Sequence, residues 1–413
     1  AGTANGQPRT DVSGIEAPGD AKNIIFLVSD GMSAGTLTMA DLHLRRHHGR
    51  RSNWLRLYEE GRVRHGLMDM ASANSIVTGS AAAASSWGSG HRVFNEAVNM
   101  SEDGEEYRTI LEIFRDAGKG TGLVTTTRIT HATPSGFGIN MPARWSEDKI
   151  AAQHLEREYD VLMGGGARHF DSDQRDDGQN LFQAFEDKGY TVAQSKSGLN
   201  TWGHEGAFLG TFYDTHLPYV LDHQNISSHR QRVPRLPKMT DAALQRLSQN
   251  NDGFLLQVEG GRVDHAAHED DTGGLVYDQV EFDEAIGTAL DFAEGRDDTL
   301  APPKRPAGRV PGGLPREERS RPAARGHPGQ LHVGQLARGG PHLRLRGACR
   351  DGTRQRGDRR LHAQHGPLRP DGGVGRGARV RARLRGEHRG GRRRLREDEA
   401  RAGRLGNCVE IDR

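Results

Sequence analysis

The sequence predicts an α/β fold with a central, mostly parallel sheet that is flanked by helices on both faces. Residues 23–29 (NIIFLVS) and 253–257 (GFLLQ) are continuous apolar runs, a pattern typical of strands buried on both faces of a parallel sheet. Residues 109–118 form an amphipathic pattern closed by Gly118, and it leads directly into an apolar run at 121–127. Such β-α-β alternation implies parallel strands joined by crossover helices.

The remaining elements can be placed in chain order from periodicity and from Gly and Pro positions. We expect helices at 34–48, from Ser80 onward, and at 109–118, 178–188, 240–250 and 275–294, and strands at 23–29, 121–127, 159–166, 190–193 and from 253. Residues 196–238 are expected to be irregular. A further strand is due near residue 300, where the sequence instead becomes APPKRP.

Charge and composition divide the chain into two unlike parts. Residues 302–413 contain 28 Arg and 1 Lys against 11 acidic residues, whereas residues 1–301 carry a net charge of −16. All 23 aromatic residues precede position 302. A segment without aromatic residues buries too little apolar surface to offset its chain entropy, so 302–413 is not expected to fold as an independent domain. We therefore expect a flexible arm at 1–21, a folded domain at 22–301 and an anomalous segment at 302–413.

The first twenty residues and the two cysteines give information on the cellular location of the protein. Residues 1–20 are polar and rich in Gly and Pro, which indicates a mature N-terminus or flexible arm instead of a signal peptide. Cys349 and Cys408 both lie beyond residue 301, so the acidic part has no thiol and is compatible with an oxidising compartment. No apolar run approaches about 20 residues, so no membrane span is expected.

Two polar residues stand where an α/β sheet places its ligands. Asp30 follows the first strand and precedes Gly31, at the carboxyl end of a predicted parallel strand. Ser80 opens an Ala-rich helix, where free backbone N–H groups favour an anion and a nucleophilic hydroxyl is well placed. Each has an ordinary alternative, because Asp30 could cap a helix or form a turn and Ser80 could be a simple N-cap.

A dense group of possible metal ligands follows the strand that begins at residue 253. Glu259, Asp264, His265 and His268 fall within ten residues. Asp264 and His268 are separated by four positions, so on a helical turn they would share one face and could bind one ion. The alternative is a solvated, charged loop after a strand.

Four separated stretches resemble the alkaline phosphatases, a family of metal-dependent phosphomonoesterases. They are VSDGM at 28–32, TGSAAA at 78–83, TTRITHATPS at 126–135 followed by Arg144, and VEGGRVDHAAH at 258–268. Their order and separations also fit the family, and the resemblance extends from about residue 22 to 300. It implies the three-layer α/β/α architecture of that family and a homodimer in the periplasm or outside the cell.

The resemblance also implies a chemistry and a set of roles. Small phosphate monoesters would be hydrolysed through a phosphoserine at a centre of two Zn²⁺ ions and one Mg²⁺ ion. The resemblance implies that Ser80 is the nucleophile and that the guanidinium of Arg144 binds the phosphate. It implies that magnesium is bound by Asp30, Thr133 and Glu259, and that Asp30 also bridges to a zinc ion. Asp264 and His268 would bind the first zinc, and His131 and His265 would lie beside the metal ligands.

These residue types suit that chemistry. A serine hydroxyl is a weak nucleophile at neutral pH, and a zinc ion activates it by favouring the alkoxide. The planar guanidinium of arginine donates two parallel hydrogen bonds to phosphoryl oxygens. Mg²⁺ prefers oxygen ligands, whereas histidine suits zinc.

The sequence departs from the family pattern in two places. Gly79 stands where many relatives have the Asp that helps to position the arginine. After residue 300 the expected Asp-His pair of the second zinc and the distal Gly-x-His of the first are missing, and the nearest candidate is GHPG at 326–329. We favour a frame-shifted translation of a GC-rich gene from about residue 302, because the break falls within an expected strand. An intact mass matching all 413 residues would contradict this hypothesis.

Other functions stay open on the sequence alone. A phosphodiesterase or sulfatase of the same superfamily is one alternative, although sulfatases carry a modified Cys or Ser in a C/S-x-P-x-R context that Ser80 lacks. A different class is a nucleic-acid-binding protein that uses a genuine basic tail beside an incomplete catalytic domain. Nucleic acid is not expected as a partner unless that tail is real.

Overall fold

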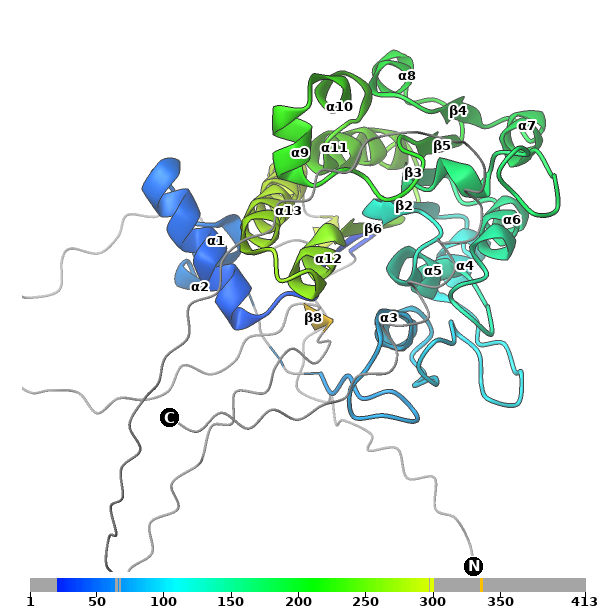
Figure 1. The fold of residues 1–413 in the computed structure, drawn as a ribbon, viewed down its shortest axis with the longest axis horizontal. Coiled ribbons are helices and arrows are strands. Elements are labelled where there is room, and N and C mark those ends of the chain that lie inside the picture. The colour runs from blue at the N-terminus through cyan, green and yellow to red at the C-terminus, as the bar shows by residue number, and fades with distance from the viewer. Residues whose placement is uncertain (1–20, 64–65, 67, 297, 301–334, 337–413) are drawn as a thin grey trace, which may run out of the picture. The chain divides into compact units, whose positions relative to one another are not determined.

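The computed structural model describes residues 21–63, 66, 68–296, 298–300 and 335–336, all within the first of the chain's two units, residues 1–344. The strands in these residues form one sheet in the order β4-β5-β3-β2-β6-β1-β7, with β8 also pairing with β1 (Figure 1). All pairings between these strands are parallel. The predicted fold class is confirmed.

The strands are β1 (Asn23–Asp30), β2 (Gly120–Arg128), β3 (Val161–Gly165), β4 (Thr191–Ala193), β5 (Phe208–Thr211), β6 (Phe254–Gly260), β7 (Thr299–Leu300) and β8 (Gln335–Leu336). The helices are α1 (Ala34–His47), α2 (Asn53–Glu59), α3 (Ser80–Gly88), α4 (Ile110–Asp116), α5 (Ala132–Gly138), α6 (Glu147–Arg157), α7 (Leu181–Asp187), α8 (Lys196–Thr201), α9 (Val220–Asn225), α10 (Ser227–Arg232), α11 (Leu236–Leu247), α12 (Arg262–His268) and α13 (Thr272–Ala293), with a 3₁₀ turn at Ala167–His169.

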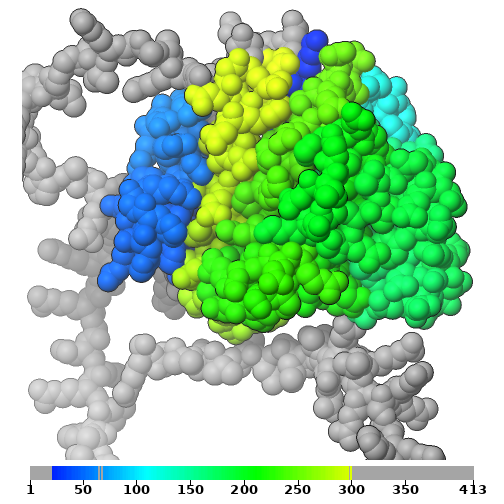
Figure 2. Space-filling model, turned by 90° about the horizontal axis from the view of Figure 1, so that it is seen from above, coloured from blue at the N-terminus to red at the C-terminus, as the bar shows by residue number. Residues whose placement is uncertain are grey.

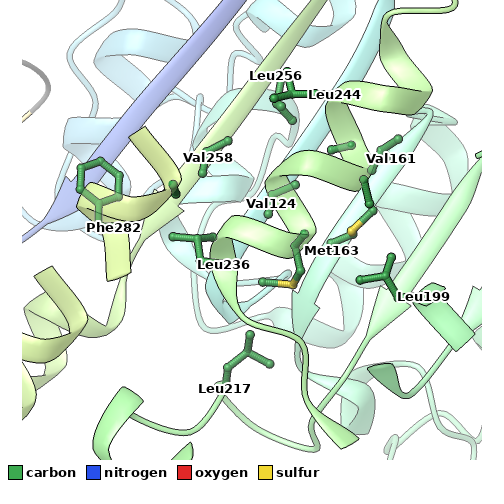
Figure 3. Close-up of a cluster of buried hydrophobic side chains, with 14 of the residues drawn as sticks. Val124, Val161, Met163, Leu199, Leu217, Leu236, Leu244, Leu256, Val258 and Phe282 are labelled. Atoms are coloured by element: carbon green, nitrogen blue, oxygen red, sulfur yellow. The ribbon is translucent and has the colours of Figure 1, made fainter. Parts of the chain in front are cut away.

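Alternate residues of the central strands enter two different hydrophobic cores. Leu256 and Val258 of β6 pack with Leu244 of α11 and Phe282 of α13 (Figure 3). Leu255, the residue before Leu256, packs on the opposite face with residues from the α4–α7 side of the sheet. Each fully buried leucine stabilises the fold by about 2 kcal/mol. Both faces of the sheet are therefore covered, as the unbroken apolar runs predicted.

Helices α1 and α2 pack against α13, so segments from the two ends of residues 21–300 lie side by side (Figure 2). The buried carboxylate of Asp283 on α13 accepts hydrogen bonds from Arg50 Nη1 at 2.9 Å and from the backbone N–H groups of Asn53 and Trp54 at 3.0 and 3.1 Å. This carboxylate fixes the start of α2 to α13 and offsets the cost of its own burial.

The expectation of an irregular 196–238 segment is wrong. It contains α8, α9 and α10, each of six residues, and β5, whose Phe208 and Leu209 are fully buried. Such short elements give too few repeats for a periodic pattern to be recognised. The helix predicted at 240–250 is α11, which begins earlier, at Leu236, with a proline in its first turn. Proline suits that position because the first helical N–H groups have no partner.

The carboxyl ends of β1, β6 and β2 lie side by side. Val28 of β1 and Thr125 of β2 are both paired with Glu259 of β6. Asp30 and Arg128, the last residues of their strands, therefore share one edge of the sheet with Glu259. This edge is where open parallel sheets bind ligands. Within the described part of the chain, no helix is both long and apolar enough to cross a membrane.

Candidate functional site

Two buried carboxylates stand at the centre of this edge. Asp30 and Glu259 are both fully buried. Glu259 accepts hydrogen bonds from the hydroxyl groups of Thr125 and, at 3.2 Å, Thr127, while its Oε1 has no hydrogen-bond partner among the described residues. Burial raises the pKa of Glu259 to about 7, although the hydroxyls of Thr125, Thr133 and Thr127 act in the opposite direction. A nearby cation would favour the ionised form of such a group.

The short helix α12 brings a third carboxylate to the same place. Asp264 is buried, and His268 Nε2 lies 3.6 Å from Asp264 Oδ1. The two residues therefore share one helical face, as their spacing predicted. Gly31 permits the close approach of the end of β1, because a Cβ atom there would lie 2.6 Å from Asp264 Cα. Its φ of +70° also favours glycine.

The serine lies at the first position of α3. The N-cap is Gly79, whose N–H donates to Asn95 Oδ1 at 2.8 Å, so the simple N-cap interpretation of Ser80 is wrong. The Ser80 side chain is buried, and its Oγ makes no hydrogen bond within the described residues. Helix α3 lies beside β8, which pairs with Ser29 and Asp30 at the end of β1. The hydroxyl thus has no role in capping its own helix and stands near the carboxylate edge.

The residues that follow β2 supply a buried hydroxyl and a buried guanidinium. Thr133 lies in the first turn of α5, is fully buried and is close enough to Glu259 to lower its pKa. Arg144 is only 3% exposed. Its backbone N–H donates to Glu96 O at 2.8 Å, and its Nη2 lies 2.8 Å from His131 Nε2. The guanidinium is therefore held in one place before any ligand arrives.

Three histidines from distant segments meet beside Arg144. His131 caps α5, His265 lies on α12, and His216 follows β5, and one ring nitrogen from each lies within 4.8 Å of the others. Burial is the largest cause that lowers their pKa values, to about 3 for His265, and neighbouring arginines lower them further. All three are therefore neutral at pH 7.

His216 is the residue of this group that the sequence did not reveal. It lies in the segment expected to be irregular, because β5 was not recognised. A polar residue just beyond Phe208–Thr211 would have been a candidate if that four-residue apolar stretch had been taken as a strand.

The site residues fit the metals that the resemblance implies. Asp30, Thr133 and Glu259 offer only oxygen atoms from their side chains, as Mg²⁺ prefers, and the Glu259 oxygen that lacks a hydrogen-bond partner is available as a ligand atom. Asp264 and His268 offer an oxygen and a nitrogen, a combination that suits zinc. The candidate GHPG at 326–329 and the rest of 302–334 lie outside the described residues.

Fold and site together define an α/β protein whose ligand site, at the carboxyl edge of a parallel sheet, combines buried carboxylates with a buried serine and arginine. A comparison with protein-family models matches residues 21–301 to the family described as alkaline phosphatase. This chain belongs to the alkaline phosphatase family.

Individual relatives agree with this assignment. The chain is 32% identical to alkaline phosphatase 3 of Bacillus subtilis, over 68% of this chain and 60% of that one, and 29% identical to the alkaline phosphatase of Escherichia coli, over 68% of each. It is also similar to the crystal structure of Thermus thermophilus alkaline phosphatase, with a TM-score of 0.66, 36% identity and coverage of 72% of this chain and 62% of that one. The chain thus spans about 60% of the length of the Bacillus subtilis relatives.

Proposed function

We propose that this chain hydrolyses phosphate monoesters through a phosphoserine formed on Ser80, at a centre of two zinc ions and one magnesium ion. The observation that carries the proposal is the buried Ser80 hydroxyl, which makes no hydrogen bond among the described residues. A buried hydroxyl without a partner is costly, so its retention at a ligand-binding edge favours a chemical role. Membership of the alkaline phosphatase family supports the same reaction.

The magnesium ligands would be Asp30, Thr133 and Glu259. The first zinc would be held by Asp264 and His268, and Asp30 would also face the second zinc. When bound, the metals stabilise the charge that develops on the attacking and leaving oxygens and lower the pKa of bound water.

The residues of the chain would act in two displacements. Ser80 Oγ forms a bond to phosphorus while the bond from phosphorus to the ester oxygen breaks, and the serine proton passes, directly or through water, to the alcohol that leaves. A water molecule then attacks phosphorus, the bond to Ser80 Oγ breaks, one proton of the water restores the Ser80 hydroxyl, and phosphate is released. Arg144 donates two parallel hydrogen bonds to phosphoryl oxygens in both steps. His131 orients the Arg144 guanidinium through the 2.8 Å contact with its Nη2.

Replacement of the nucleophile tests this proposal. Ser80→Ala is expected to lower turnover of p-nitrophenyl phosphate to background, with an unchanged circular dichroism spectrum. The matched control is Ser86→Ala, on the same helix, whose hydroxyl only donates to Ala82 O at 3.1 Å. Full activity of the Ser80→Ala protein would overturn the assignment of the nucleophile.

Two further predictions of the resemblance stay untested, namely a homodimer and a periplasmic or secreted location. Sedimentation of the purified chain measures the first, and fractionation of the producing cells measures the second. A monomer at micromolar concentration would contradict the dimer prediction.

A further inference from the structure

An exposed tryptophan follows the arginine that is proposed to bind phosphate. Trp145 is 62% exposed, whereas Arg144, the residue before it, is 3% exposed. A large aromatic side chain in water gains free energy when a ligand covers it, because apolar surface is removed from water. Trp145 is therefore available to contact the part of a substrate that extends away from its phosphate.

The ring of Trp145 lies within reach of a bound ester. Arg144 Cζ lies 4.7 Å from the centroid of this ring. A guanidinium that donates to phosphoryl oxygens has its carbon about 4 Å from phosphorus, so the ring centroid would lie at most about 9 Å from phosphorus. A phenyl ring esterified to phosphate has its centroid about 4 Å from phosphorus, and aromatic pairs prefer about 4.5–7 Å between centroids. An aryl group can therefore stack on Trp145 while its phosphate contacts Arg144.

Two further exposed apolar residues precede the proposed nucleophile. Ile76 is 92% exposed and Val77 is 44% exposed. Asn95 holds this segment, because its Nδ2 donates to Val77 O at 3.0 Å and its Oδ1 accepts from the N–H of Gly79 at 2.8 Å. Both apolar side chains are thus presented to solvent within four residues of Ser80.

A short connection joins this segment to the one that contains the tryptophan. Glu96, the residue after Asn95, accepts a hydrogen bond at its carbonyl oxygen from the N–H of Arg144 at 2.8 Å. Two residues further on, Val98 pairs antiparallel with Met141 through two backbone hydrogen bonds of 2.9 Å. The exposed apolar residues of both segments are therefore attached to the same stretch, residues 95–98, beside the proposed phosphate site.

We propose that Trp145, Ile76 and Val77 form an apolar subsite, which binds the organic group of an aromatic phosphate monoester while Ser80 and Arg144 hold its phosphate. Aryl phosphates would then be preferred over small aliphatic phosphates. This inference rests on the proposed function, since the phosphate site fixes one end of the substrate. The apolar subsite determines specificity and does not act on the bond that breaks.

Two substrates that differ in their organic group test the apolar subsite kinetically. Phenyl phosphate and methyl phosphate share the phosphate, so a change in the ratio of their kcat/KM values reports on contacts with the ring. Trp145→Ala is expected to lower the phenyl-to-methyl ratio about fivefold, and Trp145→Phe should retain most of it, because an aromatic pair contributes a factor of this order. The control is Ile113→Ala, which removes an exposed apolar side chain from α4 and should leave the ratio unchanged.

Two other roles for the tryptophan give different results. If Trp145 only positions Arg144, Trp145→Ala lowers kcat/KM for both esters by the same factor. If the exposed apolar residues instead pack against a second copy of the chain, Trp145→Ala lowers the dimer fraction in sedimentation and leaves the ratio unchanged. Either result would overturn the apolar subsite.

Binding of phosphonates separates this inference from the proposed reaction. Phenylphosphonate and methylphosphonate carry a carbon–phosphorus bond in place of the ester, so their affinities can be measured without turnover. In titrations of the full chain with zinc and magnesium, phenylphosphonate is expected to bind about fivefold more tightly, and Trp145→Ala should remove this preference. If the preference is found and neither ester is hydrolysed, the proposed reaction is wrong and the apolar subsite is supported. Equal affinities, or no binding of either phosphonate, would overturn the apolar subsite.

Discussion

The site has an acidic side and a basic side, which lie along the same edge of the sheet. On one side, Asp30, Glu259 and Asp264 bring three carboxylates into the protein interior. On the other side, Arg144 and Arg262 lie among neutral histidines. Burial disfavours charge on both sides, so a ligand of the opposite sign would stabilise each side. The comparison suggests a site that holds cations and a phosphate ester next to each other.

The largest expected effect comes from removing one carboxylate from the acidic side. Glu259→Gln keeps the shape of the side chain but removes the charge that would attract magnesium. We expect kcat/KM to fall about a thousandfold, because a metal contributes several kcal/mol to such a transition state. Measurement of bound magnesium should show a parallel loss. Glu186→Gln, on the exposed side of α7, is the control, and full magnesium content in the Glu259 variant would contradict the proposed ligand.

The next effect concerns the basic side. Arg144→Lys keeps the charge but loses the planar fork, so we expect kcat/KM for p-nitrophenyl phosphate to fall about thirtyfold. Arg108→Lys changes an exposed arginine in the same way and should have no effect. If lysine supports normal kinetics at position 144, two-point binding of the phosphoryl group by Arg144 is wrong.

A third prediction separates backbone geometry from charge on the acidic side. Gly31→Ala introduces a methyl group against Asp264 at a positive φ, and we expect about 2–3 kcal/mol of destabilisation in urea unfolding. Gly49→Ala has a similar φ of +64° but meets no atom within 4 Å. The difference between the two variants measures the close approach of β1 and α12. Equal losses would show that the contact with Asp264 is unimportant.

The smallest expected effect concerns His154 and the pH dependence of the free energy of unfolding. His154 is fully buried, its Nε2 lies 3.3 Å from Ile129 O, and burial lowers its pKa to about 4. The unfolded chain then binds a proton below about pH 6.5 while the folded chain does not, so stability falls as the pH drops. We expect His154 to contribute about 2 kcal/mol of the stability lost between pH 7 and pH 5, so His154→Gln should make that loss smaller by this amount.

The matching control for the pH dependence is His48→Gln, which changes an exposed histidine. Urea unfolding of each protein at both pH values measures the effect. An equal loss of stability in the natural chain and in the His154 variant would show that His154 does not contribute to the pH dependence.

The sequence predicted the acidic side better than the basic side, for a physical reason. Asp30 and Glu259 end long apolar strands, and Asp264 and His268 are one helical turn apart, so local patterns suffice to place them. The contacts between arginines and histidines on the basic side join residues far apart in the chain, such as Arg128 with His216. No local pattern carries that information, and the four-residue strand before His216 was missed.

Ser80 shows a different limit of sequence reasoning. A serine at the start of a helix is more often an N-cap than a nucleophile, so its position alone favours the cap. The structure excludes the cap, because Gly79 is the N-cap and its N–H group donates to Asn95 Oδ1. The interaction with Asn95 links residues sixteen positions apart, so helix propensity alone could not reveal it.

The most direct test of the central claim is to identify the phosphorylated residue. The full chain, incubated with a phosphate monoester and zinc and magnesium, is quenched in acid so that a phosphoserine survives, then digested and analysed by mass spectrometry. The proposal predicts a phosphate on the peptide that contains Ser80 and none on the same peptide from the Ser80→Ala protein. Substrate turnover without phosphate on Ser80 under these conditions would contradict it.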